Sequence, residues 1–114
     1  MTIKIKERAT EASTYLVTLT VTDEDGTPMT PNTAVWTLVD QNGVVVNSRE
    51  DVVFDSLGPT MEILLYGDDL LLPGTDVDDE FRTIVAEGTY DSSHGSNLPF
   101  VYDAEFRVNN VITK

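Results

Sequence analysis

The chain has a single histidine, His94, which is the natural place to look for acid–base or nucleophilic chemistry. It lies in the polar run Ser92-Ser93-His94-Gly95. A catalytic triad needs a nucleophile and a separately positioned acid around the imidazole. Asp91 and Ser93 are too close to His94 in the sequence to take those positions easily. We therefore expect a loop histidine, and the sequence predicts no catalytic residue and no enzyme.

Two acidic runs, at residues 23–25 and 76–80, offer carboxylates that could bind a metal ion. Calcium needs six to eight oxygen ligands that converge on one point. Neither run has the spaced Asp-x-Asp-x-Asp-Gly pattern, and consecutive carboxylates on an extended backbone point in opposite directions. We expect solvated acidic loops and no cofactor, with calcium as the alternative.

Trp36 could stack against a sugar or fill a protein core. It alternates with Ala34 and Leu38 in an extended run, which is typical of one buried strand face. A buried tryptophan in this position suits the core of a β-sandwich. The pattern therefore predicts a core residue.

Charge is strongly negative and unevenly distributed. Twenty acidic residues against seven basic ones give a net charge of −13. Binding to nucleic acid or to an anionic membrane needs a basic face, so neither is expected as a partner. Three of the seven cations, Lys4, Lys6 and Arg8, lie in the first eight residues. They are either ordinary surface charges or a basic arm that docks on an acidic neighbour, which includes another copy of the chain.

A second candidate contact is the segment Asn97-Leu98-Pro99-Phe100, which places two apolar side chains beside a polar loop. If Leu98 and Phe100 are exposed together, they can anchor a partner. The alternative is that they cover the end of the core.

Length and composition indicate one domain. The 114 residues suit a single core, and the absence of cysteine excludes disulfides and thiolate metal sites. No apolar run follows the basic N-terminus, so no secretory signal is expected. The longest apolar stretches are too short to cross a bilayer. We expect a protein that is made in the cytoplasm.

Alternation of apolar and polar residues with a period of two dominates the chain. It predicts an opening strand at Ile3 and Ile5 and at most one short helical turn near Asp68–Leu72. A polar loop is expected at 91–99, and all five prolines are expected in loops or at strand starts. The other predicted strands are 14–22, 33–40, 44–46, 52–54, 61–66, 81–90 and 101–108. Seven to eight short antiparallel strands predict an all-β sandwich, with a barrel as the alternative.

The run from Val17 to Asp40, with Thr-Asp-Glu-Asp-Gly-Thr-Pro and Trp-Thr-Leu within it, resembles bacterial immunoglobulin-like domains. With Gly-Asp-Asp-Leu at 67–70 and Tyr-Asp-Ser at 90–92, nearly the whole chain is similar to short immunoglobulin-like structural proteins of tailed bacteriophages. The resemblance implies one immunoglobulin-like β-sandwich over 1–114, with 1–8 as a basic arm or an edge strand. It also implies a virion component and transfers no catalytic residue.

The leading hypothesis is a non-enzymatic attachment protein of a bacteriophage particle, at the capsid, the head–tail junction or the tail. Its partners would be other virion proteins or copies of itself, and it would be made in the host cytoplasm. The expected partner-binding residues are Lys4, Lys6, Arg8, Leu98 and Phe100. The alternative is a carbohydrate- or calcium-binding immunoglobulin-like module of a bacterial surface system.

Overall fold

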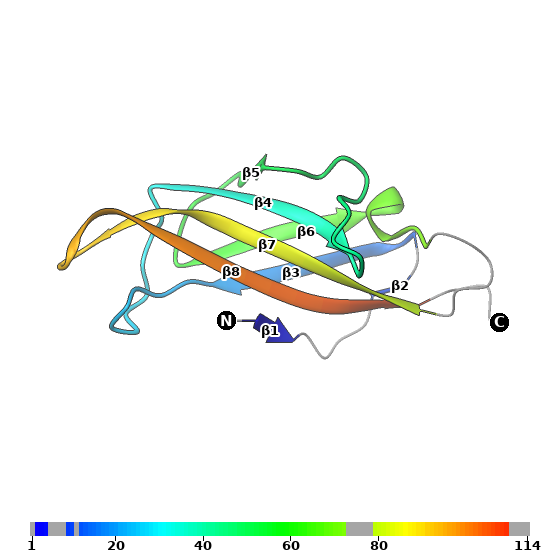
Figure 1. Cartoon of the computed structure of the whole chain (residues 1–114), viewed down its shortest axis with the longest axis horizontal. Coiled ribbons are helices and arrows are strands. Elements are labelled where there is room, and N and C mark those ends of the chain that lie inside the picture. The colour runs from blue at the N-terminus through cyan, green and yellow to red at the C-terminus, as the bar shows by residue number, and fades with distance from the viewer. Residues whose placement is uncertain (1, 5–8, 11, 73–78, 110–114) are drawn as a thin grey trace.

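The computed structural model describes residues 2–4, 9–10, 12–72 and 79–109, and in them the chain is all β apart from one 3-10 turn. The molecule is elongated, with principal extents of 52 × 25 × 23 Å (Figure 1). No helix in these residues is long and apolar enough to cross a membrane. The elements are β1 Thr2–Lys4, β2 Ala9–Thr10, β3 Thr14–Thr20, β4 Thr33–Asp40, β5 Val52–Val53, β6 Thr60–Tyr66, η1 Gly67–Leu70, β7 Asp79–Ser92 and β8 Gly95–Asn109.

The strands form two sheets. The larger has the order β1-β8-β7-β4-β5, with β2 also paired to β8, and the smaller is the antiparallel pair β3-β6. The prediction that all strands are antiparallel is wrong at one edge, because β1 and β2 run parallel to β8. Period-two alternation indicates an extended strand but carries no information about the direction of a partner a hundred residues away.

The β7–β8 hairpin is longer than expected. Most of the predicted loop at 91–99 is strand, since β7 ends at Ser92 and β8 begins at Gly95. Pro99 therefore lies inside a strand, opposite Thr89, and not at a loop or strand start. Pro99 comes before the part of β8 that pairs with β1, so among the described strands one side of β8 is an open edge at this position. A residue without an N–H is tolerated at such an edge.

The predicted strand at 44–46 is reduced to an isolated bridge between Val39 and Val45. The Gln41-Asn42-Gly43 turn itself forms as expected. Asp40 accepts hydrogen bonds from the N–H groups of Asn42 and Val44, and Gly43 has a φ of 81°. The segment then stays beside β4, because the Val46 N–H donates to the Leu38 carbonyl and the Leu38 N–H donates to the Arg49 carbonyl, but these bonds do not form a regular ladder.

The core lies between the two sheets. Buried and exposed residues alternate along β6 without exception, and the same pattern holds for most of β3 and β4. Trp36 is only 6% exposed, which confirms its prediction as a core residue. The largest fully buried side chains come from both sheets and include Leu38, Met61, Ile63, Leu65, Ile84 and Phe106. The predicted short helical turn also forms, as η1.

Candidate functional site

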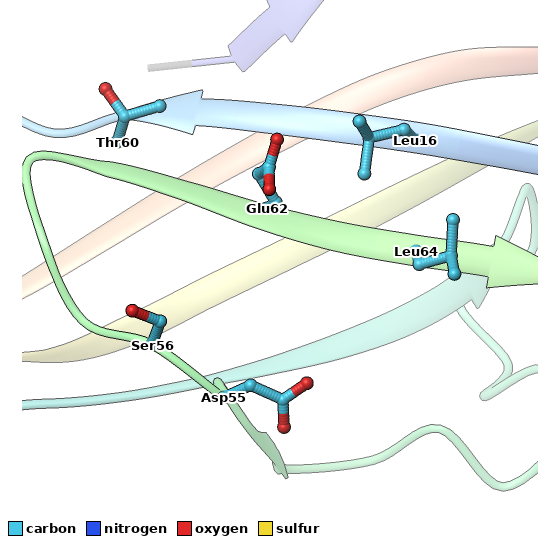
Figure 2. Close-up of a pocket in the computed structure, with 6 residues that line it drawn as sticks. All are labelled: Leu16, Asp55, Ser56, Thr60, Glu62 and Leu64. Carbon is cyan, nitrogen blue, oxygen red and sulfur yellow. The ribbon is translucent and has the colours of Figure 1, made fainter.

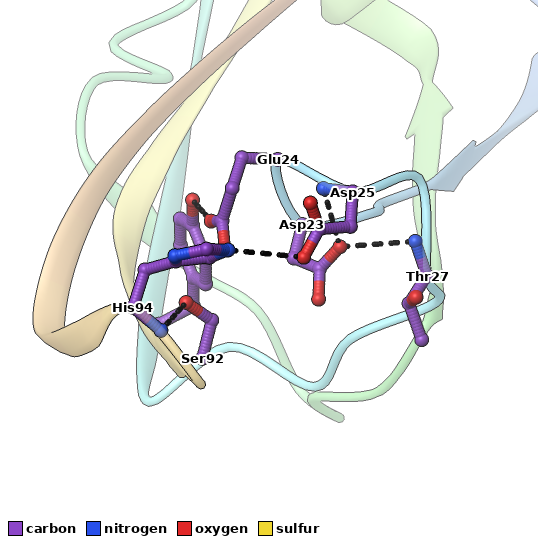
Figure 3. A network of polar contacts seen from close by, with 7 residues as sticks. Asp23, Glu24, Asp25, Thr27, Ser92 and His94 are labelled. Carbon is purple, nitrogen blue, oxygen red and sulfur yellow. Dashed lines mark hydrogen bonds and ion pairs between the residues drawn. The ribbon is translucent and has the colours of Figure 1, made fainter.

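His94 meets the first acidic run at one end of the molecule (Figure 3). Its Nε2 atom lies 3.1 Å from Asp25 Oδ2 and 3.6 Å from Glu24 Oε2. The histidine lies in the turn between β7 and β8, and the two carboxylates lie in the turn after β3. Residues almost 70 positions apart are thereby brought together, which no local sequence pattern indicates.

Each of the two turns is held by its own hydrogen bonds. Asp23 accepts from the N–H groups of Asp25 and Thr27, a side-chain-to-backbone turn (Figure 3). Ser92 Oγ accepts from the His94 N–H at 3.1 Å. Glu24 then joins the two turns, because the Tyr90 hydroxyl donates to its Oε1 at 2.7 Å. The acidic turn and the hairpin are therefore connected both through Glu24 and through His94.

The electrostatics of this end follow from those bonds. The hydrogen bond from Tyr90 is the main reason that the pKa of Glu24 lies below its ordinary value. The same bond raises the pKa of Tyr90 to about 12. At neutral pH Glu24 is therefore a carboxylate and Tyr90 is a neutral donor.

The chemistry available to this cluster is limited. Ligand atoms of Glu24, Asp25 and His94 lie within 4.8 Å of one another, but all three side chains are exposed. Two carboxylates and an imidazole fall well short of the six to eight oxygens that calcium requires. Ser92 Oγ contacts the backbone N–H of His94 and not its ring, so the imidazole–carboxylate pair has no aligned nucleophile within the described residues. The arrangement favours an ion pair that ties the two turns together when His94 is protonated.

A second charged group, which the sequence did not single out, is the pair Arg49–Asp69. Asp69 is fully buried and accepts hydrogen bonds from Arg49 Nε at 2.8 Å, Arg49 Nη2 at 3.2 Å, Asn47 Nδ2 at 2.8 Å and the Tyr66 N–H at 3.1 Å. The guanidinium also lies 5.9 Å from the Trp36 ring centroid and 5.7 Å from that of Tyr66. The one available signal was that Arg49 is the only cation between residues 9 and 81.

The pKa of Asp69 reflects opposing effects. Burial by itself raises this pKa, but the hydrogen bonds from Arg49, Asn47 and the Tyr66 N–H outweigh burial and hold it below its ordinary value. Because both carboxylate oxygens are occupied by groups of the same chain, we interpret the pair as a structural clasp between the 47–49 segment and η1.

A recess runs along β6 (Figure 2). It has a volume of about 410 Å³ and is lined by Leu16, Asp55, Ser56, Thr60, Glu62 and Leu64. Figure 2 shows the Asp55–Ser56 segment on the side of β6 that faces away from β3. A second hollow of about 270 Å³ adjoins it, with Trp36, Phe54 and Ile63 among its lining residues.

The structure describes only part of the set of predicted partner-binding residues. Lys4 lies in β1, where its backbone is opposite Glu105, while Lys6 and Arg8 lie outside the described residues. Phe100 is buried, with its ring 6.3 Å from that of Tyr90, and Leu98 is half-buried against the core. In the isolated chain Leu98 and Phe100 therefore form no exposed anchor and instead cover the end of the core, which was the alternative.

The second acidic run, at residues 76–80, is also described only in part. Residues 76–78 lie outside the described part of the chain, and of Asp79 only the backbone is described, as the first residue of β7. Glu80 is buried and forms an ion pair with Arg82, which also donates to the Leu71 carbonyl. Glu80 is thus part of the buried framework and not of a solvated acidic loop.

Comparison with known proteins finds no family model, no curated protein and no solved structure that matches this chain.

Proposed function

We propose that the chain is a non-enzymatic attachment protein of a bacteriophage particle, with an immunoglobulin-like sandwich as its framework. The strand order supports the framework. In chain order, β3 and β6 correspond to strands B and E, and β4, β5, β7 and β8 to strands C, C′, F and G. A B–E sheet facing a G-F-C-C′ sheet is the arrangement of variable-type immunoglobulin domains. The similarity at 17–40 to immunoglobulin-like domains covers the second half of β3 and all of β4 in this arrangement.

The observation that carries the attachment role is an apolar area on the outer face of the β3–β6 sheet. Leu16, Leu64 and Tyr66 are each a little over half exposed, and Leu16 is directly opposite Leu64 in the ladder. Exposed apolar side chains grouped on a rigid sheet form a surface that a partner can bury. The virion as location, the host cytoplasm as place of synthesis and other virion proteins as partners belong to the same proposal.

Sedimentation of lysates from the source organism tests the role directly. An antibody raised against the purified chain is used to follow it through a density gradient that separates intact particles from free protein. We expect the chain to sediment with the particles and to stay with them in high salt. Recovery only in the free-protein fractions, from lysates that contain particles, would rule the role out.

A further inference from the structure

We propose that the unpaired edge of β6 is a docking site for an extended, basic segment of a partner protein, which adds to the small sheet as a third strand. The inference rests on the proposed attachment role, for which it supplies the contact surface. Three observations carry it: the direction of the backbone groups, the recess beside the strand and the sign of the charge along it.

The backbone of β6 has a regular row of hydrogen-bonding groups to which no described residue bonds. Residues opposite each other in an antiparallel ladder alternate between hydrogen-bonded and non-hydrogen-bonded pairs. Val21 donates to the Pro59 carbonyl, one step beyond the pair Thr20–Thr60, so Met61, Ile63 and Leu65 belong to the bonded pairs. The N–H and C=O groups of Thr60, Glu62 and Leu64 therefore point away from β3.

The Tyr66 N–H shows independently that these backbone groups point away from β3. It donates to Asp69 Oδ2 and not to Thr14, its partner in the ladder. Within the described residues, β6 pairs with no strand other than β3. An exposed row of this kind is the template that strand addition uses.

The recess gives the incoming strand a place to put its side chains. It extends from the outer face of the sheet, where Leu16 and Leu64 line it, past the edge of β6 to the Asp55–Ser56 segment. A strand paired at that edge would therefore cover part of the recess and the neighbouring hollow (Figure 2). Side chains on one face of that strand would point inward toward Phe54 and Ile63, and those on the other face would lie beside Glu62 and Leu64. The occupant should therefore alternate apolar and polar residues.

The charge of the side chains at the recess determines which polar residues the occupant should carry. Glu62 and Asp55 are both exposed at the recess, and neither forms an ion pair within the described residues. Lysine or arginine at the outward positions would complement them. Residues 3–6 of this chain have the same alternation, but Thr2–Lys4 already pair with β8 in the same molecule. Two copies, each with a net charge of −13, also repel each other, so a second copy is a poor occupant. We therefore assign the site to a segment of another protein in which Ile, Val or Leu alternates with Lys or Arg.

The test measures binding of a labelled, end-capped peptide of alternating isoleucine and lysine to the full chain by fluorescence anisotropy. Leu64→Pro removes one outward N–H without touching the bonds to β3, and we expect it to weaken binding roughly tenfold. Leu16→Pro is the matched control, because Leu16 is the same residue type in the same pair, with equal exposure, on the opposite edge. The Leu16→Pro protein should bind the peptide with the affinity of the wild type.

Two further comparisons make the test decisive. Glu62→Lys should weaken binding more than Glu87→Lys, an exposed position on the other sheet, and this pair of variants carries the test if Leu64→Pro does not fold. A peptide of alternating isoleucine and glutamate should not bind. Equal binding of both peptides, or equal effects of each variant and its control, would overturn the proposal.

Self-association of the chain that Leu64→Pro abolishes would assign the edge to a second copy and would also overturn it. Failure here is distinguishable from failure of the attachment role. A chain that sediments with particles, but binds the isoleucine–lysine peptide no better than the isoleucine–glutamate peptide, keeps the role and loses this site.

Discussion

At the scale of single residues, the Arg49–Asp69 clasp joins a partly exposed guanidinium to a fully buried carboxylate. Asp69→Asn keeps the side-chain shape but leaves the Arg49 guanidinium, which is about a quarter exposed, without its counter-charge. We expect a loss of about 3 kcal/mol in the free energy of unfolding at neutral pH, measured by urea denaturation. Asp68→Asn is the control, because Asp68 is the exposed neighbour in the same turn, and it should change stability by less than about 0.5 kcal/mol.

The same clasp predicts how stability depends on pH. The pKa of Asp69 is lower in the folded chain than in the unfolded one. Its contribution is therefore fully present above the ordinary aspartate pKa and is lost as the pH falls through the depressed folded value. Urea midpoints measured from neutral to acidic pH should show the wild type approaching Asp69→Asn at the acid end. A gap between the two proteins that stays constant with pH would contradict this explanation.

The pKa of the Tyr90 hydroxyl reports directly on the contact between the two turns. Its pKa of about 12 depends mainly on the hydrogen bond to Glu24. Glu24→Gln should lower this pKa toward the ordinary tyrosine value of 10.0, because the carboxylate that opposes the phenolate is gone. Ultraviolet titration, with the Tyr90→Phe protein subtracted to isolate the Tyr90 signal, measures the shift. An ordinary Tyr90 pKa in the wild type would mean that the contact does not form.

Some of these residues could be predicted from the sequence and others could not, for a physical reason. Trp36 was predicted from its alternation with Ala34 and Leu38, and alternation reports burial directly. Asp68 and Asp69 are chemically identical neighbours, and the sequence does not show that Asp69 is the one that meets the 47–49 segment. His94 was correctly expected in a loop, but its approach to Asp25 depends on two turns separated by most of the chain.

At the scale of elements, Gly88 marks a close approach between β4 and β7. A Cβ atom built at Gly88 would lie 1.9 Å from the Thr33 carbonyl oxygen, a backbone atom that cannot simply rotate away. Gly88→Ala should therefore force the strands apart and lower the free energy of unfolding by about 2 kcal/mol.

Gly58→Ala is the matched control for that change. A Cβ atom there would meet its nearest neighbour, the Thr60 carbonyl oxygen, at 3.8 Å, an ordinary contact. We expect its stability in chemical denaturation to be equal to or slightly above that of the wild type. Equal stability of the Gly88→Ala and Gly58→Ala proteins would show that β4 and β7 can separate at this point without loss.

The strands were predictable where one face is buried and not elsewhere. Residues 33–40 and 61–66 alternate because one face of each strand lies on the core, and the predicted bounds match the structure within a residue. The outer part of the β7–β8 hairpin extends beyond the ends of the other strands (Figure 1), so its polar residues are in strands without any core to impose alternation. The parallel edge formed by β1 depends on β8, and nothing near Thr2–Lys4 in the sequence specifies that partner.

At the scale of the whole molecule, the net charge of −13 should oppose compaction. Sodium chloride screens this repulsion, so we expect the melting temperature to rise with its concentration, as measured by calorimetry. Millimolar calcium should raise it no further than sodium chloride of equal ionic strength, because the Glu24–Asp25–His94 cluster offers too few oxygens. A larger, saturable increase with calcium that Asp25→Asn removes would instead favour a calcium-binding module.

The pairing of Thr2–Lys4 with Asp103–Glu105 has a consequence for biosynthesis. During synthesis β1 leaves the ribosome about a hundred residues before its partner β8 and cannot enter the sheet until β8 follows, and β2 depends on the same strand. Contacts this distant in sequence slow folding, since the chain must close long loops before any pairing compensates for the lost entropy. We therefore expect nascent chains arrested before β8 emerges to remain sensitive to protease along their whole length, and the completed chain to become resistant in one cooperative step.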